Sequence, residues 1–284
     1  MATLEVEKVI HINQVLGDFD DANRFYADVF GAVEYMRNYD QDQRRDASLF
    51  VIGDTCIELF SPRDDESLLG ANLAKYGDSW HSFELKVPDL AAAKAVMDEH
   101  GVRVTTHRPP AFFMVHPRDV HGLLLEVCAH DMHNDPRLEP AWTAQPWRDH
   151  PLGIDRLNAL TAAVRDVDAA KAFFGALLGV APVHEGVRDG IGRTASFWLA
   201  NTMLELVEPA DDGSPVAAYI ERYGPRMWSL DCLVADVAAA RAHLEGKGLR
   251  VVDGAGDGWI AIDPRDNYGV LWQFTDQPHP GDPR

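Results

Sequence analysis

The sequence predicts an α+β fold in which four βαβββ units follow one another along the chain, two in each half. Three observations support this expectation. The two halves repeat each other, each half shows the same order of strand and helix patterns twice, and a proline-rich segment separates the halves.

The repeat consists of four blocks that recur in the same order at an offset of 147 or 148 residues. For example, TCIELFSPRDD in the first half matches TMLELVEPADD in the second. The blocks begin at His11, Thr55, Ala74 and Met114 in the first half, and at Ala159, Thr202, Glu221 and Ala261 in the second. Conserved order at a constant offset indicates a tandem duplication.

Within the first copy, residues 9–16 have the pattern of a strand and residues 20–30 that of an amphipathic helix, which Gly31 ends. Strands are expected at 49–52 and 56–60, around the turn residues Gly53 and Asp54. The same order then recurs, and the second unit comprises a strand at 81–87, a helix at 90–100, and strands at 102–105, 112–116 and 123–128.

These patterns divide the chain into a first domain at 1–129, a linker at 130–152 with four prolines, and a second domain at 153–284. Each domain is long enough to be expected to have its own hydrophobic core.

Composition excludes several classes of partner. The chain has 26 Lys and Arg against 45 Asp and Glu, a formal charge of −19, so it is not expected to bind nucleic acid or an anionic membrane. The three cysteines are too few and too widely spaced for a disulfide framework. The sequence shows no signal peptide and no long apolar run, so we expect a cytoplasmic protein.

These blocks resemble the vicinal oxygen chelate superfamily, which includes glyoxalase I, extradiol dioxygenases and bleomycin-resistance proteins. The similarity covers nearly the whole chain, and the first half is most similar to methylmalonyl-CoA epimerase, through WHSFELKVPDL and VHPRDVHGLLLEV among other segments. The resemblance implies two cup-shaped domains, a small-molecule substrate, and one divalent metal ion on the concave face of a cup. A homodimer is compatible with it, as is a duplication that replaces such a dimer.

Transferred position by position, the resemblance implies that the metal ligands are His11, Glu58, His81 and Glu126. Two imidazoles and two carboxylates suit Zn, Mn, Co, Ni, Mg or Fe(II), with positions left for substrate. Strand alternation also places His11, Asn13 and Val15 on one face of the first strand.

The second copy lacks most of this ligand set. Ala159, Ser229 and Gln273 are expected at the positions of His11, His81 and Glu126, so only Glu205 remains and no imidazole accompanies it. The second domain is therefore expected to be metal-free. Five other histidines are expected to be solvated, and His121 among them could line the mouth of the cup: His107, His116, His121, His130 and His133.

Three functions compete. The first is a lyase or isomerase that acts beside a carbonyl group, with Glu126 and Glu58 as the catalytic carboxylates. The second is an Fe(II)-dependent extradiol dioxygenase, and the third is a non-catalytic protein that sequesters a ligand or antibiotic. One departure from the epimerase pattern is Ala47 at the position of a second acidic base, with Asp46 beside it. An anionic CoA ester would have to be recruited by local groups such as Arg44, Arg45, Arg108 or Arg118, but these arginines are expected to be solvated surface charges.

Overall fold

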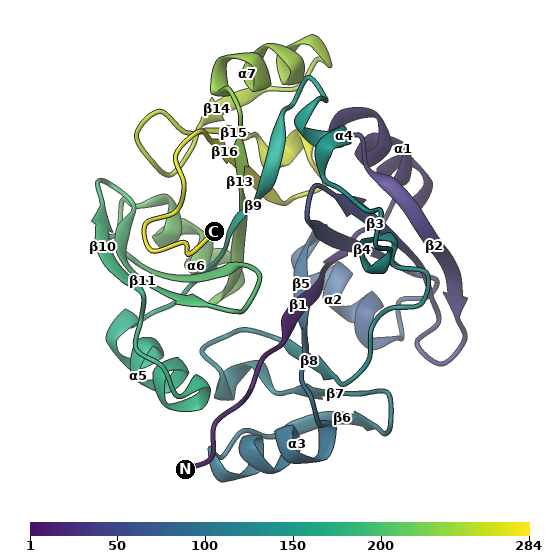
Figure 1. Ribbon diagram of the computed structural model, residues 1–284, viewed down its shortest axis with the longest axis vertical. Helices are drawn as coiled ribbons and strands as arrows, with labels where there is room; N and C mark the ends of the chain where they lie inside the picture. Colours follow the sequence, from purple (N-terminus) through teal and green to yellow (C-terminus); the bar gives the residue numbers. More distant parts are fainter.

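The computed structural model describes residues 1–284, and its strands form two eight-stranded sheets, one in each half of the chain (Figure 1). The elements of the first half are β1 (Lys8–Val15), α1 (Phe19–Phe30), β2 (Val33–Asp40), β3 (Arg45–Ile52), β4 (Thr55–Pro62), α2 (Leu68–Tyr76), β5 (Ser79–Lys86), α3 (Leu90–Glu99), β6 (Val104–Arg108), β7 (Phe112–Val115), the 3-10 turn η1 (Pro117–Asp119) and β8 (Leu125–Cys128).

The second half repeats this order after a connection that holds η2 (Pro136–Leu138) and α4 (Gln145–Arg148). Its elements are β9 (Ile154–Ala163), α5 (Val167–Leu178), β10 (His184–Arg188), β11 (Gly192–Trp198), β12 (Met203–Pro209), α6 (Pro215–Tyr223), β13 (Arg226–Val234), α7 (Val237–Gly246), β14 (Val251–Asp253), β15 (Ile260–Ile262), η3 (Pro264–Asp266) and β16 (Leu271–Thr275).

The strand order confirms the predicted fold class of four βαβββ units. The first sheet runs β2-β3-β4-β1-β5-β8-β7-β6, and the second runs β10-β11-β12-β9-β13-β16-β15-β14. In each sheet the first strands of the two units pair antiparallel at the centre, as β1 does with β5 and β9 with β13. No helix of the chain is long and apolar enough to cross a membrane.

Two elements of the first half were not located from the sequence. Strand β2 is largely exposed and mixes polar with apolar residues without a regular alternation, so it gives no period-two signal. Helix α2 has only nine residues, although the Ser67 side chain caps its start by accepting a hydrogen bond from the Gly70 N–H.

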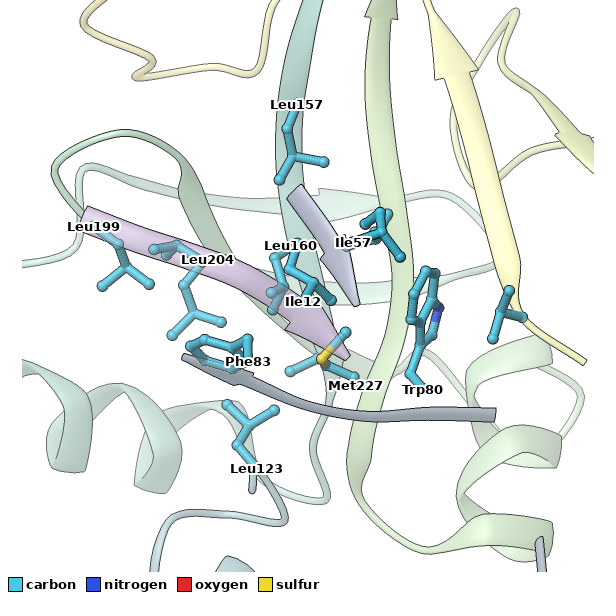
Figure 2. Packing of buried hydrophobic residues seen from close by; sticks show 14 of the residues in the cluster. Ile12, Ile57, Trp80, Phe83, Leu123, Leu157, Leu160, Leu199, Leu204 and Met227 are labelled. Carbon is cyan, nitrogen blue, oxygen red and sulfur yellow. The ribbon is translucent and has the colours of Figure 1, made fainter. Parts of the chain in front are cut away.

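Most of the hydrophobic core is shared by the two halves, whereas a separate core was expected in each domain; only two small clusters, of six buried residues in the second half and four in the first, lie within one half. A single cluster of 55 buried residues draws on both sheets and on helices α1, α3, α5 and α7. Figure 2 shows Ile12, Ile57 and Phe83 of the first sheet packed against Leu160 and Met227 of the second. The sheet faces that carry these apolar residues therefore lie back to back.

The contacts between the halves are related by the duplication. A Cβ atom on Gly122 would lie 2.0 Å from the Pro225 carbonyl oxygen, and one on Gly269 would lie 2.0 Å from the Asp78 carbonyl oxygen. Gly269 is the counterpart of Gly122 and Pro225 that of Asp78, so each half presents the same turn to the same segment of the other. Both glycines have positive φ, and no larger residue fits either position.

Candidate metal centre

Polar side chains gather on the face of the first sheet that points away from the shared core. Asn13 on β1 lies opposite both Glu58 on β4 and Ser82 on β5, and Glu84 on β5 lies opposite Glu126 on β8. Residues that pair directly across neighbouring strands point to the same side of a sheet. We call this face the first cup, and its polar residues are His11, Asn13, Arg45, Glu58, Ser82, Glu84 and Glu126.

Strand β5 is bulged at His81. Asn13 pairs with Ser82 while the next residue of β1, Gln14, pairs with Trp80, so His81 has no partner on β1. A bulge inserts one extra residue and changes the direction of the side chains around it. The His81 ring lies at the edge of the first cup, with its centroid 6.1 Å from that of the Phe60 ring.

His11 lies between two carboxylates in the first cup. Its Nε2 atom is 3.2 Å from Glu58 Oε2, and its Nδ1 atom is 3.4 Å from Glu84 Oε2. All three side chains are buried. Arg45 approaches Glu58 from the other side, with 3.5 Å between Nη1 and Oε1, and its guanidinium covers the Phe60 ring.

Asn13 links Glu126 to His81 through Ser82. The Asn13 Nδ2 group donates a hydrogen bond to Ser82 Oγ at 2.8 Å and lies 3.5 Å from Glu126 Oε2. The His81 Nδ1 atom is 2.9 Å from the same Ser82 Oγ atom. Because a hydroxyl oxygen can accept two hydrogen bonds, His81 can donate from Nδ1 and keep the Nε2 lone pair free for a metal ion.

The electrostatic balance of the first cup favours an added cation. Burial raises the pKa of Glu58 to about 8 and that of Glu126 to about 7. Burial and the nearby charge of Glu126 also raise the pKa of Glu84. Burial lowers the pKa of His11 to about 3, so its imidazole is neutral. The first cup therefore holds three buried carboxylates but one guanidinium, that of Arg45, which lies beside Glu58.

Several buried polar atoms of the first cup have no hydrogen-bond partner. They are both ring nitrogens of His11, Asn13 Oδ1, Glu84 Oε2, and the Nε and Nη1 atoms of Arg45. Buried polar atoms usually have a partner, and a bound ion is one of the ordinary partners for atoms that form no hydrogen bond within the protein. Unpartnered imidazole nitrogens beside carboxylates are the donor set that a divalent metal ion takes.

The structure brings together only part of the predicted ligand set. His11 and Glu58 are adjacent and Glu126 lies behind Asn13, while His81 stands at the edge of the cup. As the side chains lie, no three histidine, cysteine or carboxylate groups are arranged to hold a metal ion. The four-residue ligand set therefore stays a prediction.

Two residues of the first cup were missed or misjudged from the sequence. Glu84 was missed because strict alternation from His81 would point it away from the cup, and the bulge reverses this. A usable signal was present, since the second copy has an acid, Asp231, at the matching place in an apolar strand. The expectation that Arg45 is a solvated surface charge is wrong, because its side chain is buried against Glu58 and Phe60.

The equivalent face of the second sheet, which we call the second cup, holds a closed polar network. Arg188 Nη2 lies 2.6 Å from Glu205 Oε2, and His279 Nε2 lies 3.3 Å from Glu205 Oε1. Asp231 accepts hydrogen bonds from Thr161, Ser229 and Gln273.

Two expectations about the second cup need correction. The position of His81 is taken by Trp228, not by Ser229, since Trp228 is the unpaired residue of the matching bulge. An imidazole is also present, because the C-terminal segment brings His279 to Glu205. This contact joins residues 74 positions apart, and the repeat alignment ends before His279.

Comparison with known proteins identifies the family. The chain matches the Glyoxalase/Bleomycin resistance protein/Dioxygenase superfamily over residues 10–116 and again over residues 160–262. The chain therefore belongs to this superfamily, with one matching region in each half. Members of the superfamily include epimerases and dioxygenases, and members bind a divalent metal ion.

The similar sequences match over one half of the chain's length. An ethylmalonyl-CoA/methylmalonyl-CoA epimerase from Cereibacter sphaeroides is 36% identical over 128 residues, 42% of this chain and 95% of that protein. The mitochondrial methylmalonyl-CoA epimerase of Homo sapiens is 31% identical over 48% of this chain and 84% of its own length.

A solved structure resembles both halves together. A mutant of 4-hydroxymandelate synthase from Streptomyces coelicolor superimposes with a TM-score of 0.74, over 95% of this chain and 92% of its own. The sequence identity is 12%, so this likeness describes the fold alone.

Proposed function

We propose that this protein is a divalent-metal-dependent lyase or isomerase that moves a proton at a carbon beside a carbonyl group, and that its ion binds in the first cup. The observation that carries the proposal is His11, whose buried ring faces two carboxylates while neither ring nitrogen forms a hydrogen bond. A divalent ion would satisfy these groups at once.

The proposed ligands are His11, Glu58, His81 and Glu126. His11 and Glu58 lie close enough to share an ion, and the bond between Ser82 and His81 Nδ1 orients the His81 ring. When bound, the ion supplies Lewis-acid stabilisation of negative charge that develops on a carbonyl oxygen of the substrate.

Proton transfer is assigned to the carboxylates of the first cup. The raised pKa of Glu126, about 7, suits a group that takes and returns a proton near neutral pH, and Asn13 holds one of its oxygens. Glu58 is the second candidate, with a raised pKa of about 8. Burial keeps bulk water away from both groups.

The epimerase relatives support proton chemistry, and the first cup differs from their pattern at one place. Ala47 lies on the cup face opposite Phe60, whereas Asp46 points to the other side and pairs with Arg63 at 2.6 Å. Asp46 is therefore a poor candidate for a second base. Glu84 supplies an additional carboxylate inside the cup, so a second acid comes from β5 instead of β3.

The proposal is tested by metal analysis followed by isotope exchange. Purified protein should contain about one divalent ion per chain by inductively coupled plasma mass spectrometry. The Mn-, Co- or Zn-loaded protein should then incorporate deuterium from solvent at the carbon beside the carbonyl of a small panel of thioesters and ketones. Oxygen uptake with catechols by the Fe(II)-loaded protein would instead favour a dioxygenase. Tight ligand binding with neither reaction would favour sequestration.

A further inference from the structure

A pocket of about 570 Å³ opens beside His81, at the boundary between the two halves. Its wall includes His81, His116, Arg118 and His121 from the first half and Arg226 from the second, and no Asp or Glu side chain lines it. We call it the His81 pocket. The chain as a whole has a formal charge of −19, so a pocket wall with two arginines and no carboxylate differs in charge from the rest of the molecule.

Neither guanidinium of the His81 pocket is neutralised by a carboxylate. The acid next to Arg118, Asp119, instead pairs with Arg103 at 2.7 Å. Arg226 is buried and donates a hydrogen bond from Nη2 to the Trp80 carbonyl oxygen at 2.5 Å, and its guanidinium lies over the Tyr76 ring. An arginine without an acidic partner can bind a carboxylate or a phosphate through two parallel hydrogen bonds.

The duplication provides an internal comparison. The counterpart of the His81 pocket is a second pocket, of about 640 Å³, which Arg265 lines at the position of Arg118. There Arg265 donates from Nε to Asp263 Oδ1 at 2.9 Å, and three acids line the wall, namely Asp21, Asp78 and Asp266. That pocket therefore has no free guanidinium at this position.

Three differences between the two pockets all make the His81 pocket more positive. His116 stands where the counterpart has Asp263, Pro225 stands where it has Asp78, and Arg226 stands where it has Ser79. Two of these changes remove an acid and the third adds a cation. Arg118 has no carboxylate partner because His116 replaces the residue that corresponds to Asp263, which in the other pocket pairs with Arg265.

We propose that the His81 pocket binds the anionic end of the substrate, a carboxylate or phosphate group, between Arg118 of the first half and Arg226 of the second. The proposal rests on the proposed function, since a metal ion beside His81 is what makes this pocket part of a substrate site. It also gives the second half a direct role, because that half contributes Arg226 to the site.

The first test is anion protection of individual arginines in the full-length protein. Phenylglyoxal labelling would be followed peptide by peptide by mass spectrometry, with malonate or inorganic phosphate added at constant ionic strength. We expect either anion to slow labelling of Arg118 several-fold and to leave Arg265 and the exposed Arg24 unchanged. Protection by malonate alone indicates a carboxylate, and protection by phosphate alone indicates a phosphate. No selective protection of Arg118 would overturn the proposal.

The second test uses a matched pair of exposed arginines. Arg118→Met should weaken binding of the protecting anion at least about tenfold by isothermal titration calorimetry, since one charge-assisted interaction is lost. Arg265→Met, at the equivalent place in the other pocket, should leave binding unchanged. Equal effects of the two variants would contradict the proposal.

Metal content separates this proposal from the proposed function. A protein that binds the anion at Arg118 but holds no metal ion would retain the pocket and contradict the proposed metal chemistry. A protein that holds one metal ion but shows no anion binding at Arg118 would contradict the pocket alone.

Discussion

The first and second cups occupy equivalent faces of two sheets with the same strand order, yet they balance charge in different ways. The second cup contains its own cation, since Arg188 lies 2.6 Å from Glu205 and His279 lies against the same carboxylate. In the first cup the nearest guanidinium, that of Arg45, stays 3.5 Å from Glu58, and the other two carboxylates, Glu84 and Glu126, form no ion pair with an arginine.

The hydrogen bonds show the same contrast. Six buried polar atoms of His11, Asn13, Arg45 and Glu84 lack a partner in the first cup, whereas in the second cup only Arg188 Nη1 does. The pKa values agree with this. Burial raises the pKa of Glu58, but at Glu205 the effect of burial is outweighed by the charge of Arg188 together with the contacts of His279 and Thr161, which leaves the pKa lowered. The arginine of the second cup pairs directly with its carboxylate, whereas the arginine of the first cup stays farther from Glu58 and leaves polar atoms there that the proposed metal ion would satisfy.

Loss of a metal ligand should give the largest effect. His11→Ala should weaken metal binding by more than about 100-fold, because even residues that only support a ligand cost 10- to 100-fold when they are changed. Metal content after dialysis, measured by inductively coupled plasma mass spectrometry, checks this. Glu205→Gln, at the position that matches Glu58, is the control and should keep about one ion per chain. If Glu205→Gln lost the ion and His11→Ala kept it, the cups would have been assigned in the wrong order.

Removal of one carboxylate from each cup should change the stability of the metal-free protein by very different amounts. Glu205→Gln should lower the free energy of unfolding by about 3–5 kcal/mol, since it leaves the partly buried Arg188 without its partner. Glu58→Gln should cost much less or stabilise the protein, because it removes a buried carboxylate whose pKa is already raised. Urea denaturation in the presence of a chelator measures both values, and equal losses would remove the distinction between the cups.

The stability of the metal-free protein should fall as the pH rises above neutral, because two carboxyl groups of the first cup, Glu58 and Glu126, have raised pKa values. His11 and His81 are neutral in the folded protein because burial lowers the pKa of each to about 3, and above about pH 6.5 they are mostly neutral in the unfolded chain as well, so they contribute little. The folded protein still holds protons there, since the pKa values of Glu58 and Glu126 are raised to about 8 and about 7, while the unfolded chain has released them. The free energy of unfolding should therefore fall as the pH rises from about 6.5 to about 8.5.

Added metal should change this pH dependence. Because the ligands bind an ion in their deprotonated forms, the stabilisation by Mn²⁺ or Zn²⁺ should grow with pH over the same interval. Thermal melting at several pH values, with chelator and with metal, measures the effect. A metal-free protein whose melting temperature rose over this interval would contradict the assignment.

The smallest effect is expected outside the cups. Asp46→Asn breaks the pair with Arg63, whose side chain is about half exposed, so it should change the free energy of unfolding by less than about 1 kcal/mol. The rate of solvent deuterium exchange into substrate should stay the same. A large loss of that rate would show that Asp46, and not a carboxylate of the first cup, is the missing base of the epimerase pattern.

Much of this arrangement could be predicted from sequence, because it depends on local periodicity. The repeat and the strand and helix patterns established the α+β fold, and alternation along β1 placed His11 and Asn13 on one face. The edge strand β2 gave no signal, since exposed strands do not need to alternate.

The errors at the site have two physical causes. The bulge at His81 shifts the alternation by one residue, which concealed Glu84. The choice of Ser229 as the equivalent of His81 has a different origin: it used the repeat offset of 148 residues in a block whose offset is 147, and the offset of 147 gives Trp228. Contacts between distant segments, such as that of His279 with Glu205, leave no trace in local spacing. The domain limits, the cytoplasmic location and the oligomeric state stay predictions.

The turns at Gly122 and Gly269, each of which contacts the other half of the chain, affect which amino-acid substitutions this protein can accept. In a symmetric pair of separate chains, one gene encodes both sides of such a contact, so any substitution appears twice. Here each side has its own codons, and a histidine at position 116 can coexist with an aspartate at position 263. Because the two copies are joined in one chain, the contact around Gly122 can acquire residues for binding while the equivalent contact around Gly269 continues to hold the two halves together.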